Sequence, residues 1–393
     1  MSKSVFLPLL LTGILFLQGS CATVRQLEDS VKKMVKGQSY DQRALVAALH
    51  QDAEKIHEEF IKTLEKLKGQ IKRKWGTKDV KVADRTRYVK YTDEYASRAI
   101  VDFDRGKITV ETLEGSHSTD RLKTALVSTL LTTSDPRSVD LFSDKSVTLS
   151  PDKKPYLFGL VLDQNKQPIG ALEPAEQFAD YAVKNLAKTR KGQGEGGDRL
   201  VRFVKLKMVK NYESKQAEHF RPIVDKYAEQ YKISPSLVLA IIKTESNFNP
   251  FAVSEAPAYG LMQLVPASGG REAFKRAKGT DQAPTAEYLF DPENNIELGT
   301  AYLNVLTFNE MESVSNPVSR DYCVIAAYNT GPGNVLKTFS RNRLLAIKVI
   351  NGMDSGELYD QLRSSLPYSE TRKYLGSVVN HRKQFVVPSE NIL

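Results

Sequence analysis

The sequence predicts an α+β protein, in which an α+β accessory domain over residues 22–212 precedes a mostly helical domain over residues 213–393. Residues 99–111 alternate apolar and polar side chains around a short turn, as β-hairpins do. Residues 237–242 are apolar on nearly every side, which is typical of a buried helix. Between these segments, residues 189–199 contain four glycines and no apolar residue, which predicts a surface loop or hinge.

Composition excludes several classes of protein. The chain has 393 residues, 41% of them apolar, which is enough for two or three domains with cores of their own. Its five histidines and two cysteines lack the HExxH and CxxC spacings of zinc sites, so we expect no metal. There is also no GxGxxG that follows a predicted strand and no GxxxxGK[ST], so we expect no nucleotide cofactor.

The N-terminus predicts export. Lys3 precedes an apolar run over residues 5–17, which is too short to span a bilayer core of about 30 Å and reads as a secretory signal. Residues 18–21, Gln-Gly-Ser-Cys, resemble the end of a bacterial lipoprotein signal, with residues 1–20 removed and Cys21 lipidated. Gln18 stands where such signals prefer Leu, and a plain secretory signal is the alternative.

Lipidation at Cys21 would hold the chain at a membrane, because each buried CH₂ contributes about 0.8 kcal/mol. Ala22 is not the Asp that retains such lipoproteins at the inner membrane. We therefore expect an outer-membrane lipid anchor, with the protein facing the periplasm. Cys323 lies among apolar residues and is expected to be a small buried hydrophobe.

The accessory domain begins with a predicted helix over residues 26–75, whose apolar side chains recur at helical spacings. The hairpin pairs residues 99–103 with 107–111, and residues 200–209 alternate as a further strand. The second half from Lys215 has 19 basic and 19 acidic residues, so the whole net charge of +9 lies before it. The basic first half favours contact with an anionic polymer or a membrane surface. The alternative is an ordinary solvated surface. We expect no nucleic-acid partner.

The helical domain contains the candidate chemistry. Ser234 and Pro235 begin the apolar helix, and Glu245 lies near its end. Burial disfavours the charged form of a carboxyl, so the pKa of Glu245 is expected to be raised, as a general acid requires. A Glu at a helix end is more often simply solvated, so this position alone is a weak signal.

An ordered series of motifs strengthens the interpretation of Glu245 as a general acid. The motifs are ESNFNP at 245–250, AVS at 252–254, YGLMQLVP at 259–266, FDP at 290–292, NI at 295–296, AAYNTG at 326–331, and LP, ETR and Tyr374 over 366–374. Together they closely resemble the lytic transglycosylases of the goose-type lysozyme superfamily. The resemblance implies a lysozyme-like transglycosylase (SLT) catalytic domain at 213–393 that acts on the glycan strands of peptidoglycan.

The resemblance further implies that Glu245 is the single catalytic acid and base. It would protonate the oxygen of the MurNAc–GlcNAc β-1,4 bond and then accept the proton of the C6 hydroxyl of the same MurNAc, leaving a 1,6-anhydromuramyl end without water. Such an enzyme is a lyase that degrades the cell wall. Other cell-wall enzymes are further candidate partners.

The remaining motif residues are expected to support this acid. Tyr328 would point its hydroxyl at Glu245, with a core aromatic as the alternative. Ser254 and Gln263 would hydrogen-bond the glycan. Met262 would form the groove floor or pack in the core. Asn329 would contact sugar or brace the following turn, and Tyr374 would line the distal wall or pack. Val265 departs from the family pattern at a sugar subsite, and Pro257 departs from it at the groove rim.

Two alternatives remain open. A true lysozyme-type hydrolase would need a second carboxylate, for which the sequence offers Glu255, Asp291, Glu293 and Glu297, none of them convincing. A non-catalytic wall-binding lipoprotein would keep the groove but not need Glu245. Reducing-end products would indicate the hydrolase, and an inconsequential Glu245→Gln change would indicate the binding protein.

Overall fold

The computed structural model describes residues 42–194 and 197–386, with side chains from residue 57. Its contacts divide the chain into residues 1–62 and residues 63–393, which are described separately. The described part of the first unit, residues 42–62, is helical. The expected signal peptide and Cys21 lie outside the described residues.

Helix α3, Gln42–Trp75, agrees with the described part of the helix predicted from periodicity. Its C-terminal half buries Leu64, Leu67, Ile71 and Trp75. Their spacing of three or four residues places them on one face of the helix. This face therefore attaches the end of α3 to the compact unit that follows.

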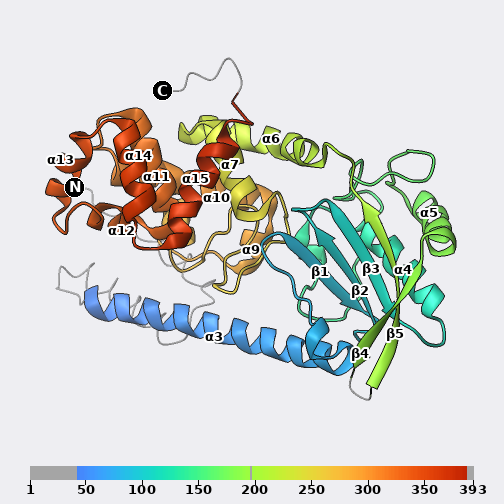
Figure 1. The fold of residues 1–393 in the computed structure, drawn as a ribbon. Coiled ribbons are helices and arrows are strands. Elements are labelled where there is room, and N and C mark those ends of the chain that lie inside the picture. The colour runs from blue at the N-terminus through green and yellow to red at the C-terminus, as the bar shows by residue number, and fades with distance from the viewer. Residues whose placement is uncertain (1–41, 195–196, 387–393) are drawn as a thin grey trace, which may run out of the picture. The chain divides into compact units, whose positions relative to one another are not determined.

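A five-stranded antiparallel sheet comes next, with the spatial order β1-β2-β3-β5-β4 (Figure 1). Its strands are β1 Arg87–Thr92, β2 Ser97–Asp102, β3 Lys107–Leu113, β4 Lys188–Gly194 and β5 Gly197–Lys207. The predicted hairpin is confirmed: β2 pairs with β3, and Asp102 lies opposite Lys107 beside the turn. We call residues 76–211 the sheet region.

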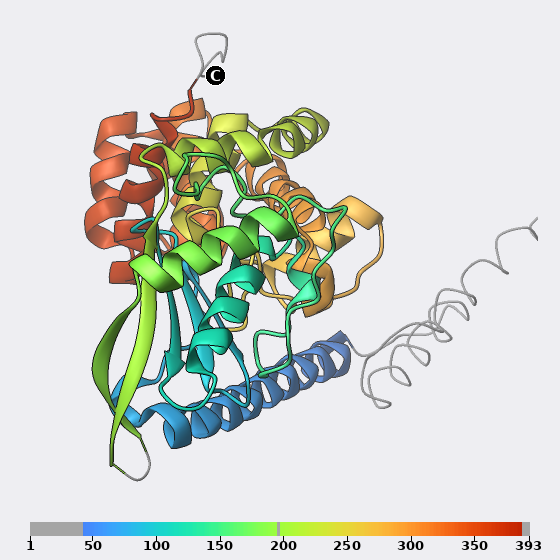
Figure 2. The ribbon, with the colours of Figure 1, turned by 90° about the vertical axis from the view of Figure 1, so that its right-hand side faces the viewer.

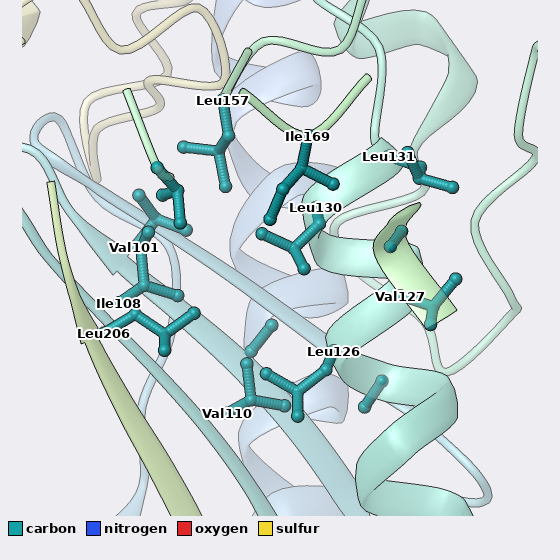
Figure 3. Close-up of a cluster of buried hydrophobic side chains, with 14 of the residues drawn as sticks. Val101, Ile108, Val110, Leu126, Val127, Leu130, Leu131, Leu157, Ile169 and Leu206 are labelled. Atoms are coloured by element: carbon teal, nitrogen blue, oxygen red, sulfur yellow. The ribbon is translucent and has the colours of Figure 1, made fainter. Parts of the chain in front are cut away.

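Two helices, α4 Ser118–Leu131 and α5 Leu172–Asn185, cover one face of the sheet (Figure 2). Figure 3 shows Leu126 and Leu130 of α4 facing Val110 of β3, and all three are buried. Short 3₁₀ turns, η2 Thr77–Asp79 and η3 Pro136–Ser138, complete the region. Alternating strand residues thus supply one half of a core and the helices supply the other.

The prediction of a loop or hinge for the glycine-rich segment, residues 189–199, is wrong. Residues 189–194 belong to β4 and residues 197–199 to β5, so the described part of this segment is a β-ribbon rather than a loop or hinge. Its side chains are mostly exposed on both faces, which hides the period-two signal. Arg190 holds the ribbon through ion pairs to Asp79 at 2.6 Å and Glu111 at 3.1 Å.

Arg98 is the centre of this buried charge network. Its guanidinium lies 2.9 Å from Asp79 and 2.6 Å from Glu111, and its Cζ lies 3.8 Å from the centre of the Trp75 ring. Only 1% of the Arg98 side chain is exposed. The network therefore joins the end of α3, the sheet and the β4–β5 ribbon.

Replacing Arg98 by Ala should lower the free energy of unfolding by about 3–5 kcal/mol, because Asp79 and Glu111 lose their fully buried partner and keep only the more exposed Arg190. Chemical denaturation measures this loss. Arg105→Ala is the matched control: Arg105 pairs with Asp102 at the surface, and its loss should cost less than about 1 kcal/mol. Equal losses for the two variants would contradict the assignment.

The rest of the chain is helical, as predicted, and we call residues 212–386 the helical region. Its helices are α6 Tyr212–Tyr231, α7 Pro235–Ser246, α8 Gly269–Lys278, α9 Ala286–Phe290, α10 Pro292–Val305, η4 Leu306–Glu310, α11 Pro317–Thr330, α12 Pro332–Lys337, α13 Arg343–Asn351, α14 Ser355–Ser365 and α15 Ser369–Arg382. Helix α7 packs against α6 and α15 (Figure 1). Cys323 is fully buried in α11, as expected.

The sheet and helical regions share apolar and polar contacts. The Phe251 ring lies 4.7 Å from the Tyr88 ring and 5.0 Å from the Tyr156 ring, which brings it into the core of the sheet region. The Asn247 side chain donates a hydrogen bond of 2.8 Å to the Phe103 carbonyl. Both contacts come from the segment that directly follows Glu245, so the sheet region supports the end of α7.

Candidate active site

Glu245 lies in the last turn of α7, with 6% of its surface exposed. The preceding residues 237–242 are almost fully buried, so this carboxyl is attached to an apolar core. Burial raises its pKa to about 7, the nearby charge of Arg85 and the Tyr374 hydroxyl lower it, and the charge of Glu370 raises it. Near neutral pH the carboxyl is therefore partly protonated, as a general acid must be.

The chain turns sharply after the acid. Asn247 and Phe248 both have positive φ angles, 46° and 62°. Asn adopts the left-handed backbone conformation readily, but a bulky Phe does not. Holding Phe248 in this conformation costs about 1–3 kcal/mol of folding free energy. Full burial of Phe248, whose ring stacks near Phe220, offsets this cost and fixes the turn. Ser246 adds a 2.8 Å hydrogen bond to the Leu261 carbonyl.

The loop at residues 259–264 is held by one side chain. Asn295 of α10 donates to the carbonyls of Tyr259 and Leu289 and accepts from the Met262 amide, each at 2.8 Å. Gly260 has φ 76°, and a Cβ there would collide with Asn295. The NI and GLMQ motifs are thus two halves of one buried hydrogen-bonded unit.

Two tyrosines lie near Glu245, and their arrangement differs from the expectation. The Tyr328 hydroxyl donates a 2.8 Å hydrogen bond to the Met262 carbonyl instead of pointing its proton at Glu245. Tyr374, expected at the distal wall or in packing, lies beside Glu245 and is 5% exposed. Its buried hydroxyl has no partner of standard hydrogen-bond geometry in the described chain. Burial raises the pKa of both tyrosines well above the usual value.

Gln263 presents an unused acceptor. Its Nε2 donates 3.0 Å to the Gly260 carbonyl, whereas its buried Oε1 has no partner among the described residues. Its backbone has φ 49°, a further strained position in this loop. Ser254 is half-buried and its hydroxyl donates to the Ala256 carbonyl at 2.9 Å. Met262 is fully buried against Gly299, where a Cβ would collide with its sulfur.

An open hollow of about 770 Å³ lies between the end of α11 and the start of α15. Asn329 lines it, and its Oδ1 accepts a 2.7 Å hydrogen bond from the Thr371 hydroxyl. Glu370, also in its lining, is the carboxylate whose charge acts on Glu245. Glu370 is thus common to the lining of the hollow and the electrostatic surroundings of Glu245.

The four second-carboxylate candidates are placed elsewhere. Asp291 caps α10 and pairs with Arg137 at 3.0 Å. Glu293 pairs with Lys226 at 2.7 Å, Glu297 pairs with Lys278 at 2.7 Å, and Glu255 is exposed on the rim loop. None of them contributes to the pKa shift of Glu245.

Sequence reasoning missed Arg85 and Glu370. Arg85 lies 160 positions before Glu245, and no local pattern connects the two. Glu370 belongs to a recognised motif, but nothing in its spacing indicates that its charge acts on Glu245. Both become visible only through the fold.

Comparisons with known proteins fit this geometry. Residues 53–219 match the family described as membrane-bound lytic murein transglycosylase C, N-terminal domain, and residues 222–351 match the transglycosylase SLT domain. The chain is 44% identical over 315 residues to membrane-bound lytic murein transglycosylase C of Sodalis glossinidius, covering 80% of this chain and 87% of that one. The chain belongs to the membrane-bound lytic murein transglycosylase C family.

A second relative in this family, from Yersinia pestis, is 42% identical over 79% of this chain and 85% of its own. Among solved structures, an inactive variant of the lytic transglycosylase Slt from Pseudomonas aeruginosa is 30% identical over 41% of this chain and 23% of that chain, with a TM-score of 0.32. Family membership agrees with the lipoprotein-like start, the accessory domain and the GLMQ and GGR sequences at 260–263 and 269–271, which also indicate transglycosylase C.

Burial of Glu245 predicts a stability effect with a definite sign. The pKa of Glu245 is about 7 in the folded chain, against 4.5 for an ordinary Glu. The folded protein therefore becomes less stable as pH rises from about 4.5 to 7, because the unfolded chain releases this proton more readily than the folded one. Glu245→Gln removes this penalty, so the variant should be more stable than the wild type by on the order of 2–3 kcal/mol at pH 8 and nearly equal at pH 4.5. Denaturant titrations at both pH values measure the difference; a variant that is less stable at pH 8 would contradict the burial argument.

Proposed function

We propose that this chain is a lytic murein transglycosylase that cleaves the MurNAc–GlcNAc β-1,4 bond of peptidoglycan without water. The single observation that carries the proposal is Glu245, one buried carboxyl with a pKa of about 7. The names of the family relatives support the same activity.

In the first step, protonated Glu245 gives its proton to the bridging oxygen, and the bond from MurNAc C1 to that oxygen breaks. GlcNAc leaves as an alcohol, and C1 develops positive charge. In the second step, the C6 hydroxyl of the same MurNAc attacks C1 and passes its proton to the Glu245 carboxylate. The acid is regenerated and the product carries a 1,6-anhydro bridge.

The surrounding residues support this chemistry in different ways. Tyr374 lies beside Glu245 and lowers the pKa of its carboxyl, while Tyr328 fixes the 259–264 loop through the Met262 carbonyl. The unpartnered Oε1 of Gln263 is suited to accept the N–H of a sugar acetamido group. Met262, being fully buried, supports the loop from below.

The two substrate-facing candidates Ser254 and Asn329 have their polar groups engaged within the protein. Asn329 lines the hollow and Ser254 is half-buried in the rim loop, so each could exchange its internal bond for one to glycan. We further propose that residues 22–212 and 213–393 are the accessory and catalytic domains.

Mass spectrometry of soluble products tests the reaction. The full chain in detergent, incubated with peptidoglycan, should release 1,6-anhydromuropeptides, and Glu245→Gln should lower the rate by at least about 100-fold because it cannot donate the proton. Asp291→Asn is the control, since that carboxylate is engaged with Arg137. Unchanged product release by Glu245→Gln would overturn the role of Glu245.

We propose that Cys21 carries a lipid anchor that holds the protein at the outer membrane, facing the periplasm. The membrane-bound relatives support attachment to a membrane. Within residues 42–194 and 197–386, no helix has the length and apolar character to span a bilayer.

Cys21→Ala should move the protein from the membrane fraction to the soluble periplasmic fraction, because it removes the only proposed acylation site. Immunoblots of separated inner membrane, outer membrane and periplasm measure this. Cys323→Ala, which changes a buried thiol, should leave the distribution unaltered. Outer-membrane retention of the Cys21 variant would contradict the anchor.

A further inference from the structure

A charged residue of the sheet region reaches the end of α7. Arg85 lies in the segment just before β1, and its Nη2 donates a 3.4 Å hydrogen bond to the Thr244 carbonyl, one residue before Glu245. Its Nη1 lies 3.7 Å from Oε1 of Glu370 at the start of α15. The guanidinium is therefore shared between the acid-bearing helix and a carboxylate on the neighbouring helix.

Backbone contacts fix this position from both regions. On the helical side, Asn249 donates to the carbonyls of Asp84 and Arg85 at 3.5 and 3.1 Å. On the sheet side, the Phe103 amide donates to the Thr86 carbonyl at 3.0 Å, and Asp84 Oδ1 accepts from the Thr86 amide at 3.0 Å. The backbone around Arg85 is therefore bonded to both regions.

Other titratable groups lie on α7 and on the helices near its C-terminal end. From the elements that pack at this site they are Tyr374 and His381 of α15, Tyr328 of α11, Lys243 of α7 itself and Glu213 of α6. The two tyrosines stay neutral, Lys243 pairs with Glu213 at 2.5 Å, and His381 Nδ1 lies 3.0 Å from the Thr244 hydroxyl. Arg85 and Glu370 are the two charged groups whose opposite effects reach the Glu245 carboxyl.

We propose that Arg85 is a positioning residue of the active site, supplied by the sheet region, held by Thr244 and Glu370, and acting through its charge on Glu245. The proposal rests on the transglycosylase function proposed above and gives the sheet region a part in catalysis.

Arg85 and Glu370 together meet two opposing requirements of the acid: Glu245 must hold a proton in the resting enzyme and must be stabilised as an anion after giving it up. Glu245 becomes an anion when it gives up its proton, and a fixed positive charge nearby stabilises that anion. An arginine bonded directly to Glu245 would instead keep the carboxyl ionised in the resting enzyme, since an adjacent opposite charge lowers a carboxyl pKa by about 1–3 units. Glu370 draws the guanidinium aside, so Glu245 receives the charge without losing its proton.

The pH dependence of kcat/KM for product release by the full chain tests this. The rate falls as pH rises through the pKa of the acid, so its alkaline limb reports Glu245. Arg85→Gln should move this limb to higher pH, and Glu370→Gln should move it to lower pH, each by about 0.5 unit or more. The double variant should return close to the wild type.

Matched controls separate charge from packing. Arg87→Gln removes a neighbouring arginine that pairs with Asp84, and should leave the limb in place. Arg85→Lys keeps the charge and should restore most of the wild-type profile. Reduced activity of Arg85→Gln with an unmoved limb would show a merely structural role, and shifts of the two variants in the same direction would also overturn the proposal.

A second readout does not depend on activity. The stabilisation that Glu245→Gln gives at pH 8 should be larger in an Arg85→Gln background and smaller in a Glu370→Gln background, because each change alters the penalty of the buried anion. If the wild type releases no product, the proposed function fails, but this stability comparison still tests whether Arg85 and Glu370 act on Glu245. Equal stabilisation in the wild-type, Arg85→Gln and Glu370→Gln backgrounds would overturn the proposed role of Arg85. Glu370 has a 75% exposed side chain, so its variant should fold even if Arg85→Gln does not.

Discussion

The active site depends on the removal of one carboxyl from water. Glu245 is attached to the almost fully buried helix α7, and its burial raises its pKa by more than the nearby Arg85 and Tyr374 lower it. A solvated Glu would be ionised near neutral pH and would have no proton to give. The neighbouring hydrogen bonds and turns keep this carboxyl buried.

The supporting structure is strained where the chemistry requires close approach. Asn247, Phe248 and Gln263 all have positive φ angles, and they flank the turn after the acid and the loop that faces it. Burial of Phe248 and the three hydrogen bonds of Asn295 offset this strain. The sheet region contributes directly, because Asn247 and Asn249 bond to its backbone. The two regions are thus joined at the residues next to the acid.

Much of this could be predicted from local pattern. The hairpin, the buried helix before Glu245 and the raised pKa of that residue follow from periodicity and burial, and the ordered motifs indicated the family. The β4–β5 ribbon was mispredicted because its exposed, glycine-rich residues carry no apolar alternation. The hydrogen bond of Tyr328 to Met262 and the approach of Arg85 to Thr244 join residues 66 and 159 positions apart. Such pairings follow from tertiary structure alone, and no single-sequence pattern contains them.

The central claim is that Glu245 keeps a proton near neutral pH, and the most direct measurement is its own titration. Carbon-13 NMR of the side-chain carboxyl, with Glu245→Gln identifying the signal, should give a midpoint near 7. A midpoint near the ordinary Glu value of about 4.3 would contradict the account, because the buried acid would then be ionised in the resting protein.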